Sequence, residues 1–225
     1  MAAPKMLAGK KLIIFDWDDV FTLGSTRGYY ACYKQALRKV NINLGDEEED
    51  RRIREKWGAG HEAQIRFLLM EKPELVGRAV QEYEKAFFGD LFVDNLTLVD
   101  GAVELLTKLS QEYKLAVATG SHPKILKDRV FAKFGIPDVF CEVLTIFDID
   151  DIKHAKPDPY MVVEILRRQN VDPEDAVVVG DAENDVRMAQ SAGVEPIVVL
   201  TGHLDEERAR SLGVRHIINT VADLC

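Results

Sequence analysis

The sequence predicts an α/β protein: a mostly parallel sheet with helices on both faces, into which a block of helices is inserted. Short apolar runs recur in residues 1–23 and 95–225, and each is preceded or followed by a stretch of helical periodicity. This alternation is typical of open parallel sheets. Residues 24–94 contain helical patterns and no convincing strand. With 47% hydrophobic residues in a chain of 225, there is enough apolar material for a core.

The first strand is predicted at residues 11–15, an isoleucine-rich run that ends in Asp16-Trp17-Asp18-Asp19. Because successive side chains alternate along an extended backbone, Asp16 and Asp18 lie on the same side. One such carboxylate can serve as nucleophile and metal ligand while the other gives and takes a proton. For this segment alone, a turn or a helix cap is the other interpretation.

The inserted block, residues 24–94, predicts a separate all-helical domain that lies as a lid over the strand ends. Within it, the glycine-containing segment 57–64 is the loop expected to approach a ligand, since glycines let the backbone come close. His61, Gln64 and Arg66 are therefore candidate specificity residues. Ordinary polarity of a helix surface is the alternative for each of them.

The second strand that ends in polar residues is predicted at 114–118 and is followed by Thr119, Gly120 and Ser121. A hydroxyl group and the amides of small residues ahead of a helix can bind phosphate. A helix cap by Ser121, with Pro123 in the first turn, is the alternative, and both interpretations can hold together.

Lys156 is the third candidate, and it lies in a proline-rich segment, residues 154–159. Restricted backbone on either side fixes its position better than a helix face would. A lysine held in this way can neutralise phosphoryl oxygens and steady a phosphorylated carboxylate. A solvated surface lysine is the alternative.

The fourth candidate group follows a strand predicted at 176–179, which stops at Gly180-Asp181 and leads into a helix that contains Asp185. Asp185, one helical turn after the strand end, is expected close to Asp181. Oxygen ligands of this kind suit magnesium, whereas helix capping by Asp181 is the alternative. Because all four groups follow predicted strands of one sheet, we expect them to meet at one edge.

The remaining elements complete the alternation. Further strands are predicted at residues 140–144, 196–200 and 216–218, and helices at 102–110, 123–135 and 184–192.

Composition excludes several classes of partner. A net charge of −9 gives no basic field to attract nucleic acid. No apolar run approaches the roughly 20 residues of a membrane span, and residues 1–11 lack the pattern of a signal peptide, so we expect a cytoplasmic protein with no membrane partner. Cys32, Cys141 and Cys225 are too few and too scattered to predict a disulfide framework or a zinc site. Nothing in the sequence predicts the oligomeric state.

These four groups, in this order, resemble the motifs of the haloacid dehalogenase superfamily: D-x-D after the first strand, then Thr or Ser, then Lys, then G-D-x-x-x-D. The helical insertion looks like the cap of the subgroup that includes phosphoglycolate phosphatase and beta-phosphoglucomutase. The resemblance implies a Rossmann-like core of residues 1–23 and 95–225 and a helical cap of residues 24–94.

The resemblance also implies roles for individual residues. Asp16 is the expected nucleophile and Asp18 the general acid/base. The expected Mg2+ site comprises Asp16, Asp18 through its main-chain carbonyl, Asp181 and Asp185, the last orienting Lys156 or a metal-bound water. The expected substrate contacts are Thr119, Gly120, Ser121, Lys156, His61 and Gln64.

One departure from the family pattern concerns Asp19 and Val20, which stand where D-x-D is usually followed by Gly-Thr. Aspartate tolerates a left-handed turn better than most residues, so we expect the loop to keep its conformation. The additional carboxylate of Asp19 is expected to repel an anionic substrate or to alter proton delivery. Val20 also lacks the hydroxyl group of the usual threonine.

The resemblance implies a magnesium-dependent phosphatase that hydrolyses a small phosphorylated metabolite, such as phosphoglycolate or a sugar phosphate, through an aspartyl-phosphate. Asp18 argues against a dehalogenase or phosphonatase, whose leaving groups need no proton. A phosphomutase of the beta-phosphoglucomutase type and a non-catalytic binding relative are the alternatives.

Overall fold

The computed structural model describes residues 5–56 and 60–225, and these residues divide into two compact units. One unit comprises the chain up to Leu23 together with Thr97–Cys225, and the other comprises Gly24–Leu96. The predicted second boundary, at residue 95, lies two residues before the observed one. Each unit is described by itself.

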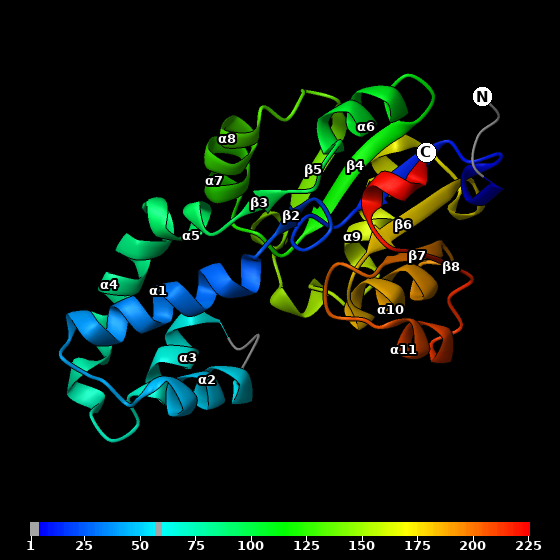
Figure 1. The fold of residues 1–225 in the computed structure, drawn as a ribbon. Coiled ribbons are helices and arrows are strands. Elements are labelled where there is room, and N and C mark those ends of the chain that lie inside the picture. The colour runs from blue at the N-terminus through cyan, green and yellow to red at the C-terminus, as the bar shows by residue number, and fades with distance from the viewer. Residues whose placement is uncertain (1–4, 57–59) are drawn as a thin grey trace. The chain divides into compact units, whose positions relative to one another are not determined.

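Six strands form the main sheet of the first unit, in the order β5-β4-β1-β6-β7-β8, and every neighbouring pair is parallel (Figure 1). The strands are β1 (Leu12–Phe15), β4 (Lys114–Thr119), β5 (Phe140–Thr145), β6 (Ala176–Gly180), β7 (Glu195–Val199) and β8 (His216–Ile218). Each coincides with a predicted run, so the predicted parallel sheet is confirmed. The strand order reverses at β1, between β4 and β6, and ligands bind outside the carboxyl ends of strands at such a switch point.

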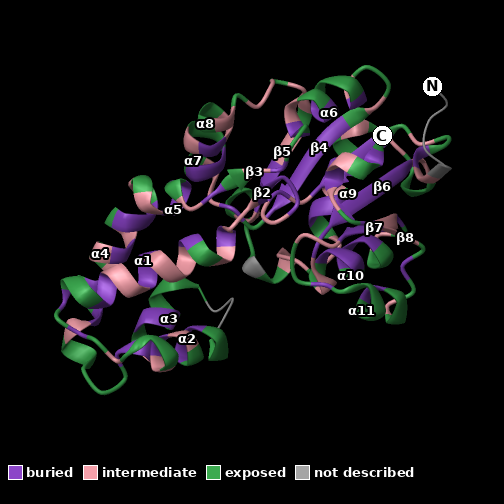
Figure 2. Ribbon diagram, in the orientation of Figure 1, coloured by how far each residue is buried: buried purple, intermediate pink, exposed green. Residues whose placement is uncertain are grey.

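Every residue of β1 is buried, and so is every residue of β6 (Figure 2), which requires cover on both faces of the sheet. On one face, Leu12, Ile14 and Val178 belong to a core cluster that also contains apolar residues of α9 and α10. The helices of this unit are α6 (Ala102–Leu109), α7 (Pro123–Ile125), a π-helical segment (Leu126–Phe131), α8 (Ala132–Phe134), α9 (Tyr160–Gln169), α10 (Glu183–Ser191) and α11 (Glu206–Ser211). Short 3-10 turns lie at Lys5–Leu7, Ile146–Asp148, Ile152–His154, Pro173–Asp175 and Val221–Leu224.

A small antiparallel pair, β2 (Thr22–Leu23) and β3 (Thr97–Leu98), lies where the chain leaves and re-enters the first unit. Two-residue strands carry no sequence periodicity, so this pair is not predictable from the sequence. The pairing explains why the second boundary follows Leu96, directly before β3.

Within residues 24–56 and 60–96, every regular element of the second unit is a helix or a 3-10 turn, as predicted. It contains α1 (Ser25–Lys39), α2 (Asp46–Glu55), α3 (His61–Leu68), a 3-10 turn (Pro73–Leu75), α4 (Val76–Phe88) and α5 (Asp90–Asp94). Helix α1 packs on α4, where the rings of Tyr33 and Tyr83 stack with centroids 4.6 Å apart. Across residues 5–56 and 60–225, no helix combines the length and apolar character needed to cross a membrane.

Candidate active site

The polar residues that follow β1, β4 and β6 lie at one edge of the sheet, because these strands are parallel and in register. Phe15 pairs with Val117 on one side and with Val179 on the other, and the Asp16 amide donates to the Val179 carbonyl at 2.9 Å. Asp16 therefore sits at the centre of the edge, where the strand order reverses.

Lys156 reaches this edge from the loop before α9 and lies between two carboxylates. Its Nζ is 2.8 Å from Oδ1 of Asp16 and 2.7 Å from Oδ1 of Asp185, and only 12% of its side chain is exposed. Burial alone lowers the pKa of Lys156, but the charges of Asp16 and Asp185 outweigh burial and raise it. The lysine is thus a largely enclosed cation held between two carboxylates, and its proline-rich segment predicted only that its position is fixed.

Three carboxylates crowd around this cation. The oxygens of Asp16, Asp181 and Asp185 lie within 4.8 Å of one another, a separation from which they could hold a metal ion together. Burial raises the pKa of Asp181 to about 8, with further contributions from the charges of Asp16 and Asp185. Burial likewise raises the pKa of Asp185, against the opposing effect of Lys156. An all-oxygen donor set with unbalanced negative charge fits a hard divalent cation.

Asp185 lies close to Asp181 for the reason predicted from the sequence, since it follows one turn into α10. Its Oδ2 accepts a hydrogen bond from the Ala182 amide at 3.1 Å. The N-cap of α10 is Ala182, so helix capping by Asp181 is wrong as an explanation of that residue.

Asp18 contacts the loop that follows β4. The Ser121 hydroxyl donates to Oδ2 of Asp18 at 2.5 Å, and the Ser121 amide donates to Oγ1 of the fully buried Thr119 at 3.2 Å. The N-cap of α7 is His122, whose Nδ1 accepts from the Lys124 amide. Capping by Ser121 is therefore wrong.

The loop after β4 has open space around its glycine. A Cβ atom built on Gly120 meets no other atom within 4 Å. A ligand can approach the loop backbone at this position, which is compatible with the predicted phosphate contact.

Asp19 adopts the left-handed conformation with φ 56°, as predicted for the residue that replaces glycine. Its amide donates to the Thr22 carbonyl at 2.7 Å, and Val20 is fully buried. The departure from the family pattern therefore leaves a closed turn after Asp18.

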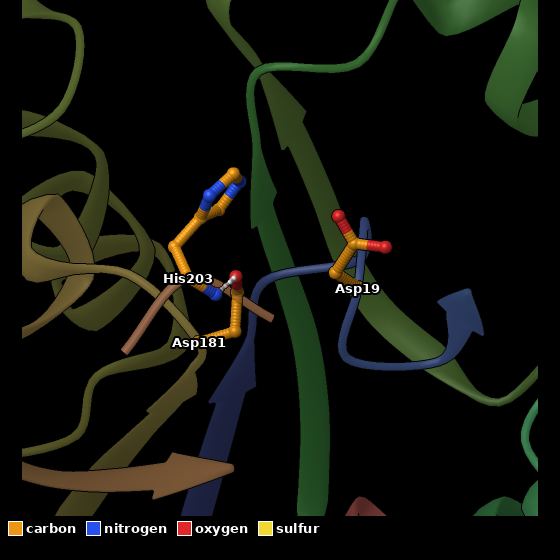
Figure 3. A group of neighbouring side chains, drawn as sticks. All are labelled: Asp19, Asp181 and His203. Carbon is orange, nitrogen blue, oxygen red and sulfur yellow. Dashed lines mark hydrogen bonds between the residues drawn. The ribbon is translucent and has the colours of Figure 1, made fainter. Parts of the chain in front are cut away.

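A second group of possible metal ligands comprises Asp19, Asp181 and His203, with ligand atoms within 4.8 Å of one another (Figure 3). His203 comes from the loop after β7, and its amide donates to Oδ2 of Asp181 at 3.0 Å. The four groups identified in the sequence do not include this loop. The position of this loop in the sequence could have indicated a role in the site, because the loop follows β7 and β7 pairs directly with β6.

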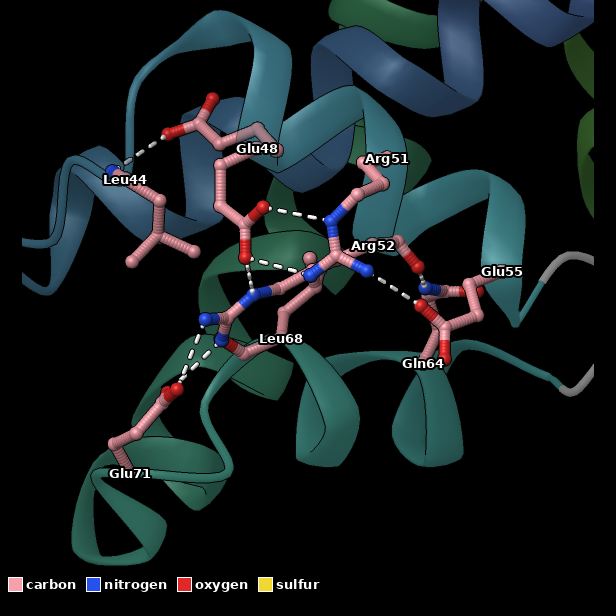
Figure 4. Close-up of polar contacts among 9 residues, drawn as sticks. Leu44, Glu48, Arg51, Arg52, Glu55, Gln64, Leu68 and Glu71 are labelled. Carbon is pink, nitrogen blue, oxygen red and sulfur yellow. Dashed lines mark hydrogen bonds and ion pairs between the residues drawn. The ribbon is translucent and has the colours of Figure 1, made fainter.

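The three candidate specificity residues of the second unit differ in their burial and in their contacts. Gln64 is 1% exposed, and its Nε2 donates to the Arg52 carbonyl at 3.1 Å, so it joins α3 to α2 (Figure 4). This burial corrects the prediction that Gln64 contacts a ligand. His61 is exposed and stacks on Tyr83, and Arg66 pairs with Glu62 of its own helix.

Residues Trp57, Gly58 and Ala59 of the predicted ligand-facing segment lie outside the described residues. The predicted approach of that segment to a ligand stays a prediction.

The chain is similar to known proteins over nearly its whole length. The sequence model of one family, described as haloacid dehalogenase-like hydrolase, matches residues 10–193. A probable phosphatase, IndB, of Dickeya dadantii is 30% identical over 224 residues, which cover 96% of this chain and 92% of the relative. A phosphorylated carbohydrates phosphatase of Thermotoga maritima is 29% identical over 203 residues, 88% of each chain.

Solved structures share the fold. A HAD-superfamily hydrolase of Geobacter sulfurreducens superposes with a TM-score of 0.73 at 21% identity, covering 96% of this chain and 95% of the other.

Proposed function

The chain belongs to the haloacid dehalogenase-like hydrolase family, and on that premise we propose that it is a magnesium-dependent phosphatase of a small phosphorylated metabolite. The proposed reaction passes through a phosphorylated Asp16. Two relatives named as phosphatases support the reaction class, and the Thermotoga relative's name supports a phosphorylated carbohydrate as substrate class.

The observation that carries the proposal is the buried lysine between two carboxylates at the edge of the sheet. Asp16 is the carboxylate at the strand-order switch, and Lys156 holds it at 2.8 Å with a permanent positive charge. Phosphoryl transfer to a carboxylate requires an ionised nucleophile beside a cation that can bind the phosphoryl oxygens.

The cofactor in this proposal is Mg2+, held by Asp16, Asp181 and the main-chain carbonyl of Asp18, with Asp185 assigned to Lys156. Burial, with further contributions from the charges of Asp16 and Asp185, raises the pKa of Asp181 to about 8, and this cost of ionisation supports a bound cation at these residues. When bound, magnesium would offset the repulsion between the attacking carboxylate and the phosphate oxygens.

In the first step, the Asp16 carboxylate attacks phosphorus while the bond to the leaving oxygen breaks and Asp18 gives that oxygen a proton. In the second step, Asp18 takes a proton from a water molecule whose oxygen attacks phosphorus. The bond to Asp16 then breaks and inorganic phosphate leaves. The Ser121 hydroxyl, 2.5 Å from Oδ2 of Asp18, is suited to keep this acid/base in place between the two steps.

The phosphate contacts in this proposal come from Lys156 and from the loop Thr119, Gly120 and Ser121. Lys156 stabilises the equatorial phosphoryl oxygens as charge develops on them. We propose the second unit as the cap, with His61 and Arg66 as its candidate specificity residues, and we leave out Gln64 because it is buried against Arg52.

Phosphate release from a panel of phosphorylated metabolites, measured with magnesium and with a chelator, tests the proposal. The panel contains phosphoglycolate, several sugar phosphates and beta-glucose 1-phosphate, the last also assayed for isomerisation. We expect phosphate release that depends on magnesium. Isomerisation without release would replace the hydrolase with a mutase, and inactivity on every substrate would favour a binding role.

A further inference from the structure

The loop after β7 contacts two separate parts of the candidate site. The Thr201 hydroxyl donates to the main-chain carbonyl of Asp19 at 2.5 Å. Two residues later, the His203 amide donates to Oδ2 of Asp181 at 3.0 Å (Figure 3). The next amide, that of Leu204, donates to the Asp181 carbonyl at 2.9 Å. One short segment thus connects the turn after Asp18 to the carboxylate that follows β6.

Gly202 explains how this segment comes so close to Asp181. A Cβ atom built on Gly202 would lie 1.8 Å from Oδ2 of Asp181, far inside van der Waals contact. Any side chain at this position would displace either the loop or the carboxylate. The close approach is therefore a requirement of the local packing.

The turn at Asp19 needs support from its surroundings. A residue with a Cβ atom is disfavoured at φ 56°, where glycine is accommodated without strain. Such conformations persist when neighbouring groups fix them. At Asp19, the amide is bound by the Thr22 carbonyl at 2.7 Å and the carbonyl accepts from Thr201, so both sides of the residue are held.

We propose that Thr201 is a positioning residue of the active site: its hydroxyl holds the left-handed turn at Asp19 and thereby fixes where Asp18 stands relative to Asp181. The inference rests on the proposed function, because the contact affects catalysis through the acid/base role proposed for Asp18. Thr201 supplies a hydroxyl contact to a turn in which Val20 has no hydroxyl. The contact comes from a loop 182 residues away.

The test compares Thr201→Val, which removes the hydroxyl and keeps the shape, with Thr201→Ser, which keeps the hydroxyl. With the best substrate of the panel, we expect Thr201→Val to lower kcat about 10-fold, since one lost hydrogen bond displaces a reacting group. KM should change less than about twofold, and Thr201→Ser should stay within about threefold of wild type. Thr107→Val, which removes an exposed hydroxyl bonded to the Val103 carbonyl in α6, is the matched control.

The sharper test is rescue from Asp19. In an Asp19→Gly background the left-handed turn needs no support, so Thr201→Val should cost only about twofold in kcat. Asp19→Asn removes the charge and keeps a side chain, and it should give no rescue. Equal losses in kcat with glycine and with aspartate at position 19, or a Thr201→Val enzyme as active as Thr107→Val, would overturn the inference.

Readouts that do not need turnover separate this inference from the proposed function. Thermal unfolding of the metal-free single and double variants should show the same coupling, with Thr201→Val lowering Tm less in the Asp19→Gly background than in the wild type. Calorimetric Mg2+ titration should show weaker binding in Thr201→Val than in Thr107→Val. Coupling in a chain inactive toward the panel would sustain the positioning contact and refute the phosphatase, whereas additive Tm shifts in an active enzyme would refute the contact alone.

Discussion

Each unit of this protein contains a buried cation among carboxylates, and the two arrangements differ in charge balance. In the first unit Lys156, 12% exposed, lies between Asp16 and Asp185, and Asp181 stands beside them. In the second unit the guanidinium of Arg52, 9% exposed, binds Glu48 at 2.6 Å and Glu71 at 2.9 Å (Figure 4). Burial of the cation is thus common to both.

The two environments shift the pKa values of their carboxylates in opposite directions. Hydrogen bonds from Arg51 and Arg52 lower the pKa of Glu48 to about 2, and Arg52 lowers the pKa of Glu71. Around Lys156, burial raises the pKa of Asp181 to about 8 and also raises that of Asp185. The Arg52 network stabilises the ionised form of its carboxylates. At the sheet edge the ionised carboxylates are destabilised, and either protonation or a further cation would relieve this. Unbalanced buried charge distinguishes a reacting site from a structural one.

The largest effect is expected from Asp16→Asn, which removes the proposed nucleophile with almost no change in shape. We expect kcat to fall by roughly 10⁴-fold or more, the scale on which enzymes lose activity with a covalent nucleophile. Circular dichroism should show an unchanged fold. Asp100→Asn, at an exposed carboxylate of the same unit, is the control. Activity of Asp16→Asn close to that of Asp100→Asn would exclude Asp16 as the nucleophile.

Much of the fold and of the site geometry follows from the sequence for a physical reason. Parallel strands read as apolar runs, and their carboxyl ends must meet at one edge, so Asp16, Lys156 and Asp185 are brought together as expected. The left-handed turn at Asp19 also follows, because few other side chains tolerate it.

Features that depend on contacts between distant residues do not follow from the sequence. Local patterns cannot show that Thr201 lies against Asp19 or that Gly202 passes over Asp181. They also cannot show which charges of a helical segment are buried. Gln64 looks like a surface residue until the pairing of α2 with α3 is known.

The next largest effect is expected from Asp181→Asn in metal-free protein. Its pKa in the folded state, about 8, is above the ordinary value of 3.8, so the folded state binds more protons than the unfolded state between these values. Stability of the wild type therefore falls as pH rises from about 4 to 8. At pH 8 the asparagine variant should unfold about 5 °C higher, as roughly 2 kcal/mol would produce in a chain of this size.

Differential scanning calorimetry across this pH range checks the sign. The advantage of Asp181→Asn should shrink as pH is lowered toward 4, and magnesium should raise Tm of the wild type more than that of the variant. A Tm of the variant below the wild type at pH 8 would contradict the idea that charge at this edge is unbalanced.

The smallest effects, and of opposite sign, are expected in the second unit. Arg52→Leu should lower the free energy of unfolding by about 1.5 kcal/mol, because it removes charge-assisted hydrogen bonds to Glu48, Glu71 and the Leu68 carbonyl. The loss stays below that of a fully buried pair, since both glutamates reach solvent and can be hydrated. Arg51→Leu, at an adjacent arginine that is 53% exposed and also paired with Glu48, should lower the free energy of unfolding less than Arg52→Leu does, because solvent screens an exposed ion pair.

Urea unfolding followed by circular dichroism compares the two variants directly. A larger loss for Arg52→Leu than for Arg51→Leu would show that burial of a balanced network stabilises the cap, opposite to the gain expected from removing Asp181. Equal losses would mean that Arg52 contributes no more than an exposed partner. In that case the contrast between the two units would lie in the carboxylates of the sheet edge alone, where Lys156 pairs with two of three clustered acidic side chains.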